Sequence, residues 1–428
     1  MIRDMINFLF TKTPLLFFIQ SLWRDEAFSY LAAKKDLLSI IVNSARDFSP
    51  PFYYFVLHYW IILFGKSEIV LRSLSFIFFW ATIYVVYLIL TDIMKFDFKK
   101  SIIYLLLFVI NPLLLYYAFE ARMYTMLAFF STLSFYALYK KKSKLYIISA
   151  VLGLYTHYFM VFVVLGQYLY SKFKQGIVLL AFSPWLLYIL LTKNIVSQSF
   201  WITKFEPSHL FTFISSIYTG YEADFKFFDK SVFMLSACLW VLMLYFFFKT
   251  KKAGTEKKHV WELFFIWGIG IPFFVAVISI FKPIFLPRYL IFSSVGLLFL
   301  MVSAFEKMPI IAKTIIIAFF VAITCSYQKF QILDRQKSNM KKPISEIKLM
   351  MNPGDVLFVT SELDFFTAQY YFGENHVYIY GKTYEEIPNY VGKVLIKKTD
   401  IAQKLPYFPY RAFVLDSWGN YTIQQSLY

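Results

Sequence analysis

Two adjacent acidic residues, Asp25 and Glu26, follow an apolar run near the start of the chain, in the segment LWRDEAFSY. Ionisable residues at a membrane are costly and are therefore candidates for function. The Asp25 carboxylate could accept a proton from an attacking hydroxyl group. We expect Asp25 to act in catalysis, with Glu26 as the second candidate beside it.

Arginines in two later segments could supply the matching positive charge. Arg122 follows Glu120 in FEARMY, and Arg288 precedes Tyr289 in LPRY. A guanidinium can hold a phosphate through two parallel hydrogen bonds, a geometry that an ammonium cannot match. A carboxylate that faces such arginines suits glycosyl transfer from a phosphate-linked donor, because the arginines offset the charge on the departing phosphate.

The elements that position these residues must lie in lipid. The 428 residues are 59% hydrophobic and 16% charged, whereas soluble domains carry about 25% charged residues. The net charge of +17 comes largely from lysines in short clusters between apolar runs. That pattern is typical of the cytoplasmic loops of membrane proteins. The composition therefore predicts a polytopic membrane protein whose partner is the lipid bilayer and not nucleic acid.

Apolar runs of about 20 residues are long enough to cross a bilayer as helices. About eleven spans are expected, at residues 5–22, 69–94, 101–118, 122–139, 144–156, 157–171, 175–192, 231–249, 261–280, 287–304 and 309–326. When these spans are threaded, the lysine clusters at 95–100, 140–144, 171–174 and 249–259 fall on one side. The positive-inside rule makes that side cytoplasmic.

The other side then receives the first outer loop, residues 23–68, and the C-terminal part of the chain. The loop contains an apolar spacing typical of an amphipathic helix in the membrane interface. Residues 327–428 carry four β-rich runs (PGDVLFVTS, HVYIYG, KVLI and RAFVLDS) and two helical ones. We therefore expect a mainly α fold, with a membrane helical bundle over 1–326 and a small extracytoplasmic α/β domain over 327–428.

Six segments occur in an order that resembles a known family. They are LWRDEAFSY, SPPFYYFVLHYW, FGKSEIVLRSLS, YYAFEARMYTML, LYTHYFMVFVVLGQYLY and KPIFLPRYLIF. Together they resemble the GT-C type polyprenyl-phosphate-dependent glycosyltransferases, in the bacterial branch related to protein O-mannosyltransferases and lipid A aminoarabinose transferases. The resemblance implies an inner or plasma membrane enzyme that moves a monosaccharide, with inversion, from a polyprenyl phosphate to an extracytoplasmic protein, lipid or glycan acceptor.

The resemblance also implies roles for individual residues. Asp25 would be the catalytic base, and Glu26 would orient a substrate or, as in some relatives, a divalent metal; no cofactor is certain. The residues implied in donor-phosphate binding are Arg72, Arg122, Arg288 and Tyr289. Those implied in the surrounding pocket are Glu120, Tyr124, His157 and His58. Ser49 stands where the aminoarabinose transferases have a lysine before the Pro-Pro pair, and this leaves the acceptor open.

Simpler interpretations stand beside these roles. Arg72 could be an interface anchor, Glu120 and Arg122 could form an ion pair, and His58 could be a packing residue. At the level of the whole protein, the alternatives are a polysaccharide ligase or polymerase, a lipid or sugar transporter, and an inactive scaffold. A transporter would place its charges near the membrane midplane between inverted repeats.

Overall fold

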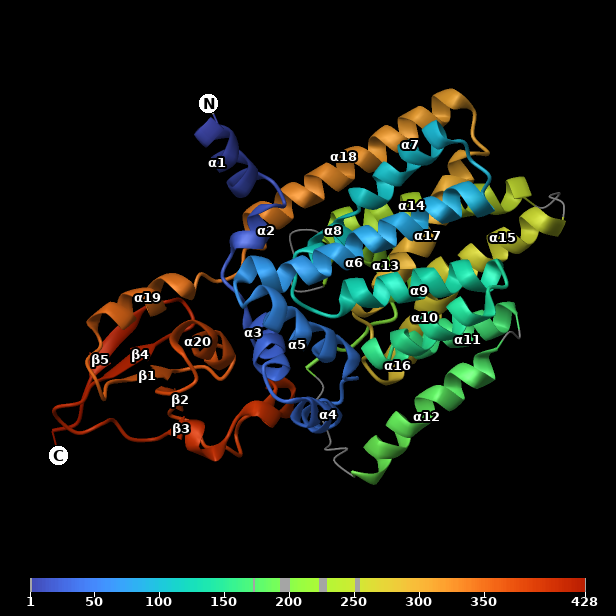
Figure 1. The fold of residues 1–428 in the computed structure, drawn as a ribbon. Coiled ribbons are helices and arrows are strands. Elements are labelled where there is room, and N and C mark those ends of the chain that lie inside the picture. The colour runs from blue at the N-terminus through green and yellow to red at the C-terminus, as the bar shows by residue number, and fades with distance from the viewer. Residues whose placement is uncertain (1, 172–173, 193–200, 223–228, 251–254, 428) are drawn as a thin grey trace.

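The computed structural model describes residues 2–171, 174–192, 201–222, 229–250 and 255–427. A long helical bundle carries a small sheet domain at one end (Figure 1). Helices make up most of the described chain, which confirms the mainly α fold expected from the sequence. Apolar side chains form a continuous core that runs from the bundle into the sheet domain.

The expected spans coincide with helices throughout. They correspond to α1 (Ile2–Lys12), α2 (Leu16–Ile19), α6 (Glu68–Leu88) with η1 (Ile89–Ile93), α7 (Phe98–Val109), α8 (Pro112–Ala118), α9 (Tyr124–Tyr139), α10 (Ser143–Thr156), α11 (Met160–Tyr170), α12 (Gln175–Leu191), α14 (Asp229–Thr250), α15 (Thr255–Phe265) with η3 (Ile266–Gly270) and α16 (Ile271–Phe281), η4 (Pro287–Leu290) with α17 (Ile291–Phe305), and α18 (Ile310–Asp334).

Length separates these helices into two groups. Within the described residues, five are long and apolar enough to cross a membrane, at 68–93, 231–250, 258–281, 287–305 and 310–334. A sixth is present if α7 and α8, which meet at 70°, form one bent span. The other expected spans are shorter, and the first is divided into α1 and α2 around Pro14. The structure thus shows a multi-pass membrane protein, and the number eleven stays a prediction.

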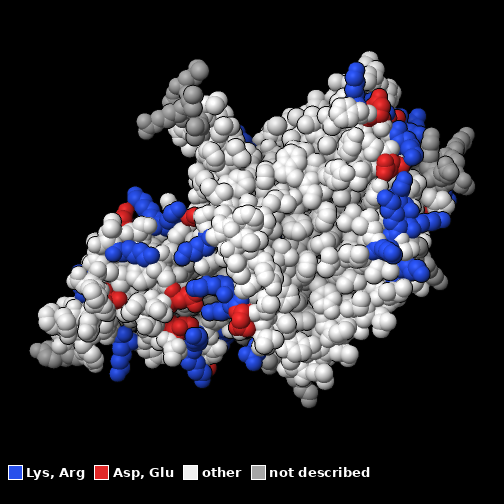
Figure 2. All heavy atoms as spheres, in the orientation of Figure 1, with Lys and Arg blue, Asp and Glu red and all other residues white. Residues whose placement is uncertain are grey.

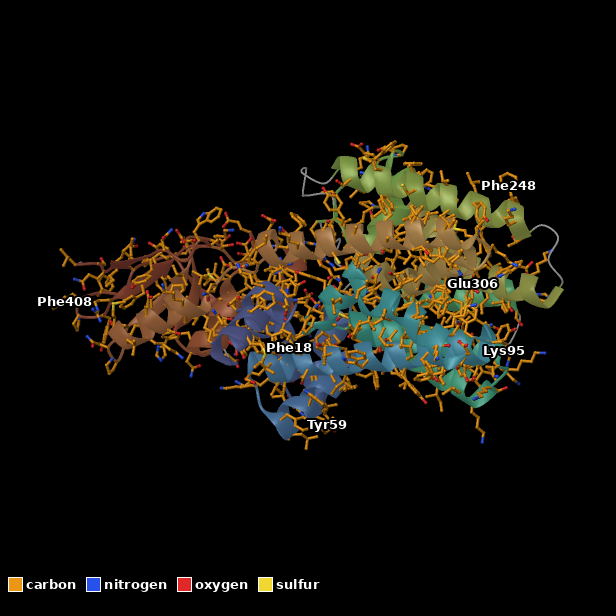
Figure 3. The ribbon with its side chains drawn as sticks, turned by 90° about the horizontal axis from the view of Figure 1, so that it is seen from above. Phe18, Tyr59, Lys95, Phe248, Glu306 and Phe408 are labelled. Atoms are coloured by element: carbon orange, nitrogen blue, oxygen red, sulfur yellow. The ribbon has the colours of Figure 1, made fainter. Side chains whose placement is uncertain are left out.

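Charged side chains gather at the two ends of the molecule and leave an uncharged belt between them, on the face that Figure 2 shows. At the end opposite the sheet domain, Lys100 and Lys313 both pair with Glu306. Figure 3 places Lys95 and Glu306 at that end and Phe408 of the sheet domain at the other. The uncharged belt is what a helical bundle presents to lipid.

The first outer loop folds into three helices: α3 (Arg24–Ala33), α4 (Leu37–Arg46) and α5 (Phe52–Phe64). The expected amphipathic helix is confirmed as α4, which begins where the Asp36 side chain accepts a hydrogen bond from the Ser39 N–H. A further helix, α13 (His209–Thr219), lies between the expected spans at 175–192 and 231–249, where no helix was predicted. Its Phe213, Ile214 and Ile217 side chains are buried, and it packs between α14 and α16.

The C-terminal part forms a five-stranded sheet in the order β3-β2-β1-β4-β5, parallel except for β5. Its elements are α19 (Lys341–Met350), β1 (Val356–Val359), α20 (Phe365–Phe372), β2 (Val377–Tyr380), η5 (Asn389–Val391), η6 (Lys393–Leu395), η7 (Lys398–Asp400), β3 (Ile401–Ala402), β4 (Ala412–Leu415) and β5 (Tyr421–Gln424). The prediction of a strand at KVLI is wrong. These residues form η6, because the Ile396 N–H donates a hydrogen bond to the Lys393 carbonyl and closes a 3-10 turn.

The sheet domain docks on the first outer loop through α20 and α3. The rings of Phe28 and Phe366 lie 5.5 Å apart, and those of Tyr30 and Tyr370 lie 5.1 Å apart. The Leu22 N–H donates to the Tyr371 hydroxyl at 2.8 Å. These contacts fix the sheet domain against the loop that carries Asp25. The predicted boundary after residue 326 falls within α18, which continues to Asp334.

Candidate active site

A cavity of about 330 Å³, called here the charged cavity, lies where the first outer loop, the bundle and the sheet domain meet. It brings together six of the ten residues proposed from the sequence, and these six come from four segments of the chain. They are Asp25, Arg122, Tyr124, His157, Arg288 and Tyr289. Segment 389–392 of the sheet domain forms another part of its wall.

Asp25 lies in the first turn of α3, where a helix favours negative charge. Its side chain is 17% exposed, and its Oδ1 accepts a hydrogen bond from Arg24 Nε at 2.9 Å. Burial alone would raise the pKa of Asp25, but Arg24, Arg122 and Arg288 together lower that pKa to about 2. Asp25 is therefore a carboxylate at neutral pH.

Two arginines face this carboxylate with unused hydrogen-bonding capacity. Arg122 Nη1 donates to the Ser29 hydroxyl at 3.1 Å and to the Asp25 carbonyl at 3.3 Å. Arg288 Nη1 lies 3.3 Å from each carboxylate oxygen of Glu222, and its guanidinium lies 5.1 Å from the centre of the Trp201 ring. The Nε atoms of both arginines are buried without an acceptor among the described residues. A phosphate oxygen would satisfy these donors.

An aromatic wall adjoins the arginines. The rings of His157 and Tyr289 lie 5.0 Å apart, and those of Tyr124 and Tyr289 lie 6.1 Å apart. His157 Nδ1 accepts the Phe159 N–H at 3.1 Å. Burial, with the charges of Arg122 and Arg288, lowers the pKa of His157 to about 3. The imidazole is therefore neutral and adds no charge to the charged cavity.

Several residues of the charged cavity were missed by the site prediction. Asp47 is the second acidic residue in its wall, and its Oδ2 lies 3.4 Å from the Ser49 hydroxyl. Burial, opposed by Arg122 and reinforced by Asp25, raises the pKa of Asp47 to about 7. The signal in the sequence was an acidic residue just before the Pro-Pro pair of the first outer loop. Arg24, Lys282 and Trp201 are further lining residues that the site prediction missed.

Glu26 and Arg72 do not line the charged cavity but form a buried ion pair beside it. Arg72 Nε and Nη2 donate to the two carboxylate oxygens of Glu26 at 2.8 and 2.7 Å. Its remaining N–H groups donate to the carbonyls of Phe18, Gln20 and Ser21. Since a guanidinium has five N–H donors, none remains for a phosphate. This placement does not support the expected donor-binding role of Arg72.

The helical geometry of α3 explains why Glu26 does not lie beside Asp25 in the charged cavity. Successive residues of an α-helix point about 100° apart, because one turn takes 3.6 residues. Asp25 therefore faces the charged cavity while Glu26 faces the bundle. There Glu26 also accepts the Ala121 N–H at 3.0 Å and pairs with Lys337 at 2.9 Å. The expectation that Glu26 is catalytic is not supported by this placement.

Glu120 and His58 also lie outside the charged cavity. Glu120 Oε2 is 3.7 Å from Lys337 Nζ, so the Glu26–Arg72 pair extends into a four-residue network. Lys337, from the segment between α18 and α19, was not singled out in the sequence. His58 Nδ1 lies 2.7 Å from the Ala33 carbonyl and holds α5 against α3. The packing interpretation of His58 fits this position, and the pocket role does not.

A metal site would need several acidic, histidine or cysteine side chains in one place. Within the described part of the chain, no group of three or more such side chains could hold a metal ion.

No protein-family model matches the chain, and no curated protein matches it either. Among solved structures, the chain is similar to ArnT from Cupriavidus metallidurans bound to undecaprenyl phosphate, with 12% identity and a TM-score of 0.62. That similarity covers 94% of this chain and 91% of ArnT. The apo state of the same ArnT is 10% identical, with a TM-score of 0.48, and the match covers 97% of this chain and 91% of that one. With a TM-score of 0.62 to the structure bound to undecaprenyl phosphate, the chain has an ArnT-like fold, as the sequence resemblance implied.

Proposed function

We propose that this protein is an inverting glycosyltransferase that moves a monosaccharide from a polyprenyl phosphate to an extracytoplasmic acceptor. The observation that carries the proposal is the charged cavity, where the ionised Asp25 faces Arg122 and Arg288 and the Nε of each arginine is buried with no acceptor among the described residues. The likeness to a structure solved with undecaprenyl phosphate supports a lipid-phosphate ligand for this fold.

A second cavity, called here the apolar cavity, supports a lipid substrate. It has a volume of about 540 Å³ and shares Trp201 and Ile202 with the charged cavity. Its wall includes Phe205, Phe213, Phe233 and Phe285. Glu222, which pairs with Arg288, also lines it, so the two cavities meet at the proposed phosphate position. Isoprenoid units next to a phosphate would find apolar surface here.

The proposed reaction is a single displacement. The acceptor hydroxyl hydrogen-bonds to Asp25, and its oxygen attacks the anomeric carbon from the face opposite the phosphate. The bond between that carbon and the phosphate oxygen breaks, the proton passes to Asp25, and the polyprenyl phosphate keeps the electron pair. Arg122 and Arg288 stabilise the negative charge that develops on the phosphate. One displacement inverts the anomeric configuration.

The low pKa of Asp25 applies to the charged cavity when no donor is bound. A bound phosphate diester would offset part of the positive charge of Arg122 and Arg288. The pKa of Asp25 would then rise towards its ordinary value, because those arginines are among the causes of its depression. Donor binding thus makes Asp25 a stronger base at the moment when the acceptor needs one.

The arrangement of charge supports the proposed orientation in the membrane. The end of the bundle opposite the sheet domain carries Lys95, Lys100, Lys140 and Lys313, which fits a cytoplasmic surface. The charged cavity lies next to the sheet domain at the other end. An outward-facing active site fits an acceptor outside the cytoplasm better than it fits a transporter, whose charges would lie at the midplane.

The decisive test is Asp25→Asn, which keeps the shape of the side chain and removes the proton acceptor. We expect transfer to fall by a factor on the order of 10²–10⁴, with membrane insertion and undecaprenyl phosphate binding retained. Mass spectrometry of cell-envelope glycans and glycoproteins, in a deletion strain complemented with each variant, measures the product.

Asp36→Asn is the matched control, since it makes the same change in the same outer loop at an exposed helix cap outside the charged cavity. Asparagine caps helices as well as aspartate does, so this variant should behave as wild type. Wild-type product levels in the Asp25→Asn strain would show that Asp25 is not the base.

A further inference from the structure

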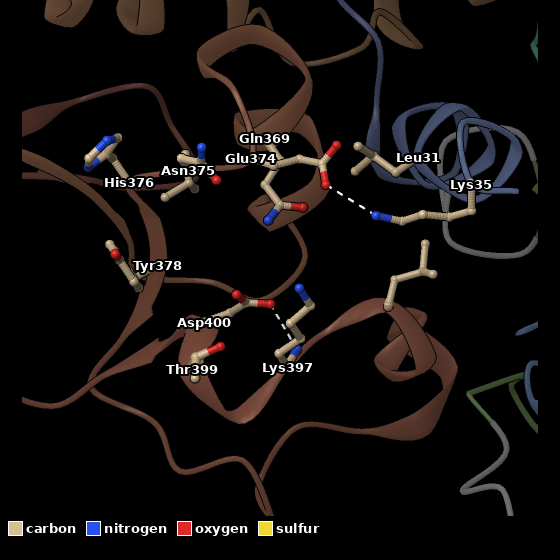
Figure 4. A pocket seen from close by; sticks show the side chains of 12 residues that line it. Leu31, Lys35, Gln369, Glu374, Asn375, His376, Tyr378, Lys397, Thr399 and Asp400 are labelled. Carbon is tan, nitrogen blue, oxygen red and sulfur yellow. Dashed lines mark hydrogen bonds and ion pairs between the residues drawn. The ribbon is translucent and has the colours of Figure 1, made fainter. Parts of the chain in front are cut away.

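A third cavity, of about 500 Å³, lies between α3 and the sheet domain and has no part in the reaction described above (Figure 4). We call it the polar pocket. Leu31 and Lys35 form the wall on the side of the first outer loop. The sheet domain supplies the rest: Gln369, Glu374, Asn375, His376, Val377, Tyr378, Leu395, Lys397, Thr399 and Asp400.

The charges that line the polar pocket balance. Two basic side chains, Lys35 and Lys397, stand with two acidic ones, Glu374 and Asp400, and Lys35 Nζ lies 3.3 Å from Glu374 Oε2. Figure 4 shows Glu374 and Lys35 reaching towards each other from opposite walls. A surface with balanced charge has no electrostatic preference for an anion such as a phosphate. It suits a neutral ligand that hydrogen-bonds.

The remaining polar groups suit hydroxyls. The amides of Gln369 and Asn375 can each donate and accept, the carboxylates of Glu374 and Asp400 accept, and the Thr399 hydroxyl does both. Tyr378 adds an aromatic ring. Such a mixture matches a sugar ring, which presents several hydroxyl groups around an apolar face. A peptide would instead need apolar side-chain pockets or a free sheet edge, and only Leu31, Val377 and Leu395 are aliphatic here.

The polar pocket and the charged cavity are built on the same two segments. Asp25 and Phe28 of α3 line the charged cavity, and Leu31 and Lys35 farther along line the polar pocket. On the sheet domain, residues 389–392 line the former and residues 395–400 the latter. Six residues of α3 separate Asp25 from Leu31, which corresponds to about 9 Å along the helix. An extended ligand can therefore reach both sites along α3.

We infer that the polar pocket binds a sugar residue of a neutral, extended glycan acceptor, whose reacting hydroxyl lies at Asp25 in the charged cavity. This inference rests on the proposed function and specifies its acceptor as carbohydrate. The sheet domain would then select the acceptor, while the helical bundle holds the donor.

The test uses full-length protein in lipid nanodiscs with neutral manno-, gluco- and chito-oligosaccharides of two to six units. Saturation-transfer difference NMR measures their binding. Thr399→Trp places an indole across the pocket at an exposed position and should weaken oligosaccharide binding at least tenfold. Thr422→Trp, on the exposed face of β5, is the matched control and should bind as wild type. Asn375→Leu, also at an exposed position, should weaken binding without adding bulk.

The outcomes separate this inference from the proposed function. The Thr399→Trp variant should still bind undecaprenyl phosphate as wild type does. That result would also show that the variant is folded. The inference is overturned if no oligosaccharide binds the wild type, if the two tryptophan variants bind equally, or if an unglycosylated peptide competes for the same site. None of these results would affect the loss of transfer in Asp25→Asn, which tests the function itself.

Discussion

The charged cavity and the polar pocket share α3 and neighbouring parts of one sheet-domain segment, yet they differ in charge. Four basic side chains, Arg24, Arg122, Lys282 and Arg288, line the charged cavity with two acidic ones, Asp25 and Asp47. The polar pocket has two of each sign. An excess of positive charge favours an anionic donor, whereas balanced charge favours a neutral ligand. Under the proposed function, this difference in charge would separate the donor site from the acceptor site.

The comparison also shows where each region gets its residues. The arginines of the charged cavity come from the bundle and from α3, while most of the polar pocket comes from the sheet domain. If the proposed function holds, the helical bundle and α3 supply the groups that hold the donor, and the sheet domain supplies most of the groups that would contact the acceptor.

The largest expected effect is a loss of donor binding in the charged cavity, with no change in the polar pocket. Replacing Arg122 and Arg288 together by Gln removes both charged donors from the phosphate position. A hydrogen bond to a charged group contributes about 1.5–3 kcal/mol, so each loss should weaken undecaprenyl phosphate binding by roughly ten- to a hundredfold. Binding of neutral oligosaccharides should be unchanged.

Isothermal titration in nanodiscs measures both ligands. Arg46→Gln is the control, because Arg46 is an exposed neighbour of Asp47 that does not line the charged cavity. An equal loss of both ligands in the double variant would mean that the two regions are not independent.

The next largest effect distinguishes the structural role of Glu26 from the catalytic role proposed for its neighbour Asp25. Glu26→Gln breaks the buried ion pair with Arg72, and breaking such pairs costs about 3–5 kcal/mol. We therefore expect a lower midpoint of thermal unfolding, with transfer close to normal in the protein that remains folded. Asp25→Asn should show the reverse: normal unfolding and lost transfer. A Glu26→Gln variant that is stable but inactive would indicate that Glu26 has a catalytic role after all.

The smallest effect concerns pH. Burial raises the pKa of Asp47 to about 7, so Asp47 is largely neutral below that pH and becomes negative above it. The charged cavity therefore loses one unit of positive charge as pH rises from 6 to 8. Binding of a sugar–phosphate diester lipid, which does not itself titrate in this range, should weaken over that interval by up to about tenfold.

Asp47→Asn should remove this pH dependence while leaving the affinity at pH 6 nearly unchanged. A pH profile that is identical in wild type and Asp47→Asn would contradict the assigned titration.

Prediction from the sequence succeeded for long apolar helices and for residues at helix ends. Helices α6, α14, α17 and α18 were predicted within a few residues at their N-terminal ends, because a strong apolar signal extends over a whole span. The set Asp25, Arg122 and Arg288 was predicted from residue type and from the sidedness of the loops. The short helix α13 and the turn at KVLI were missed, since short apolar runs do not distinguish helix, strand and loop.

The sequence by itself predicted that this chain lies in a membrane, that the lysine clusters between its spans fall on one side, and that the carboxylates and arginines proposed for the site lie on the other. Only the tertiary structure decided which of those charges share a cavity. Asp25 faces Arg122 and Arg288 while Glu26 pairs with Arg72, because the 100° turn between successive helical residues sends neighbours to different surroundings. Contacts between distant segments give Asp47, Lys337 and the residues of the polar pocket their partners. Such contacts cannot be predicted from the spacing of residues along the sequence.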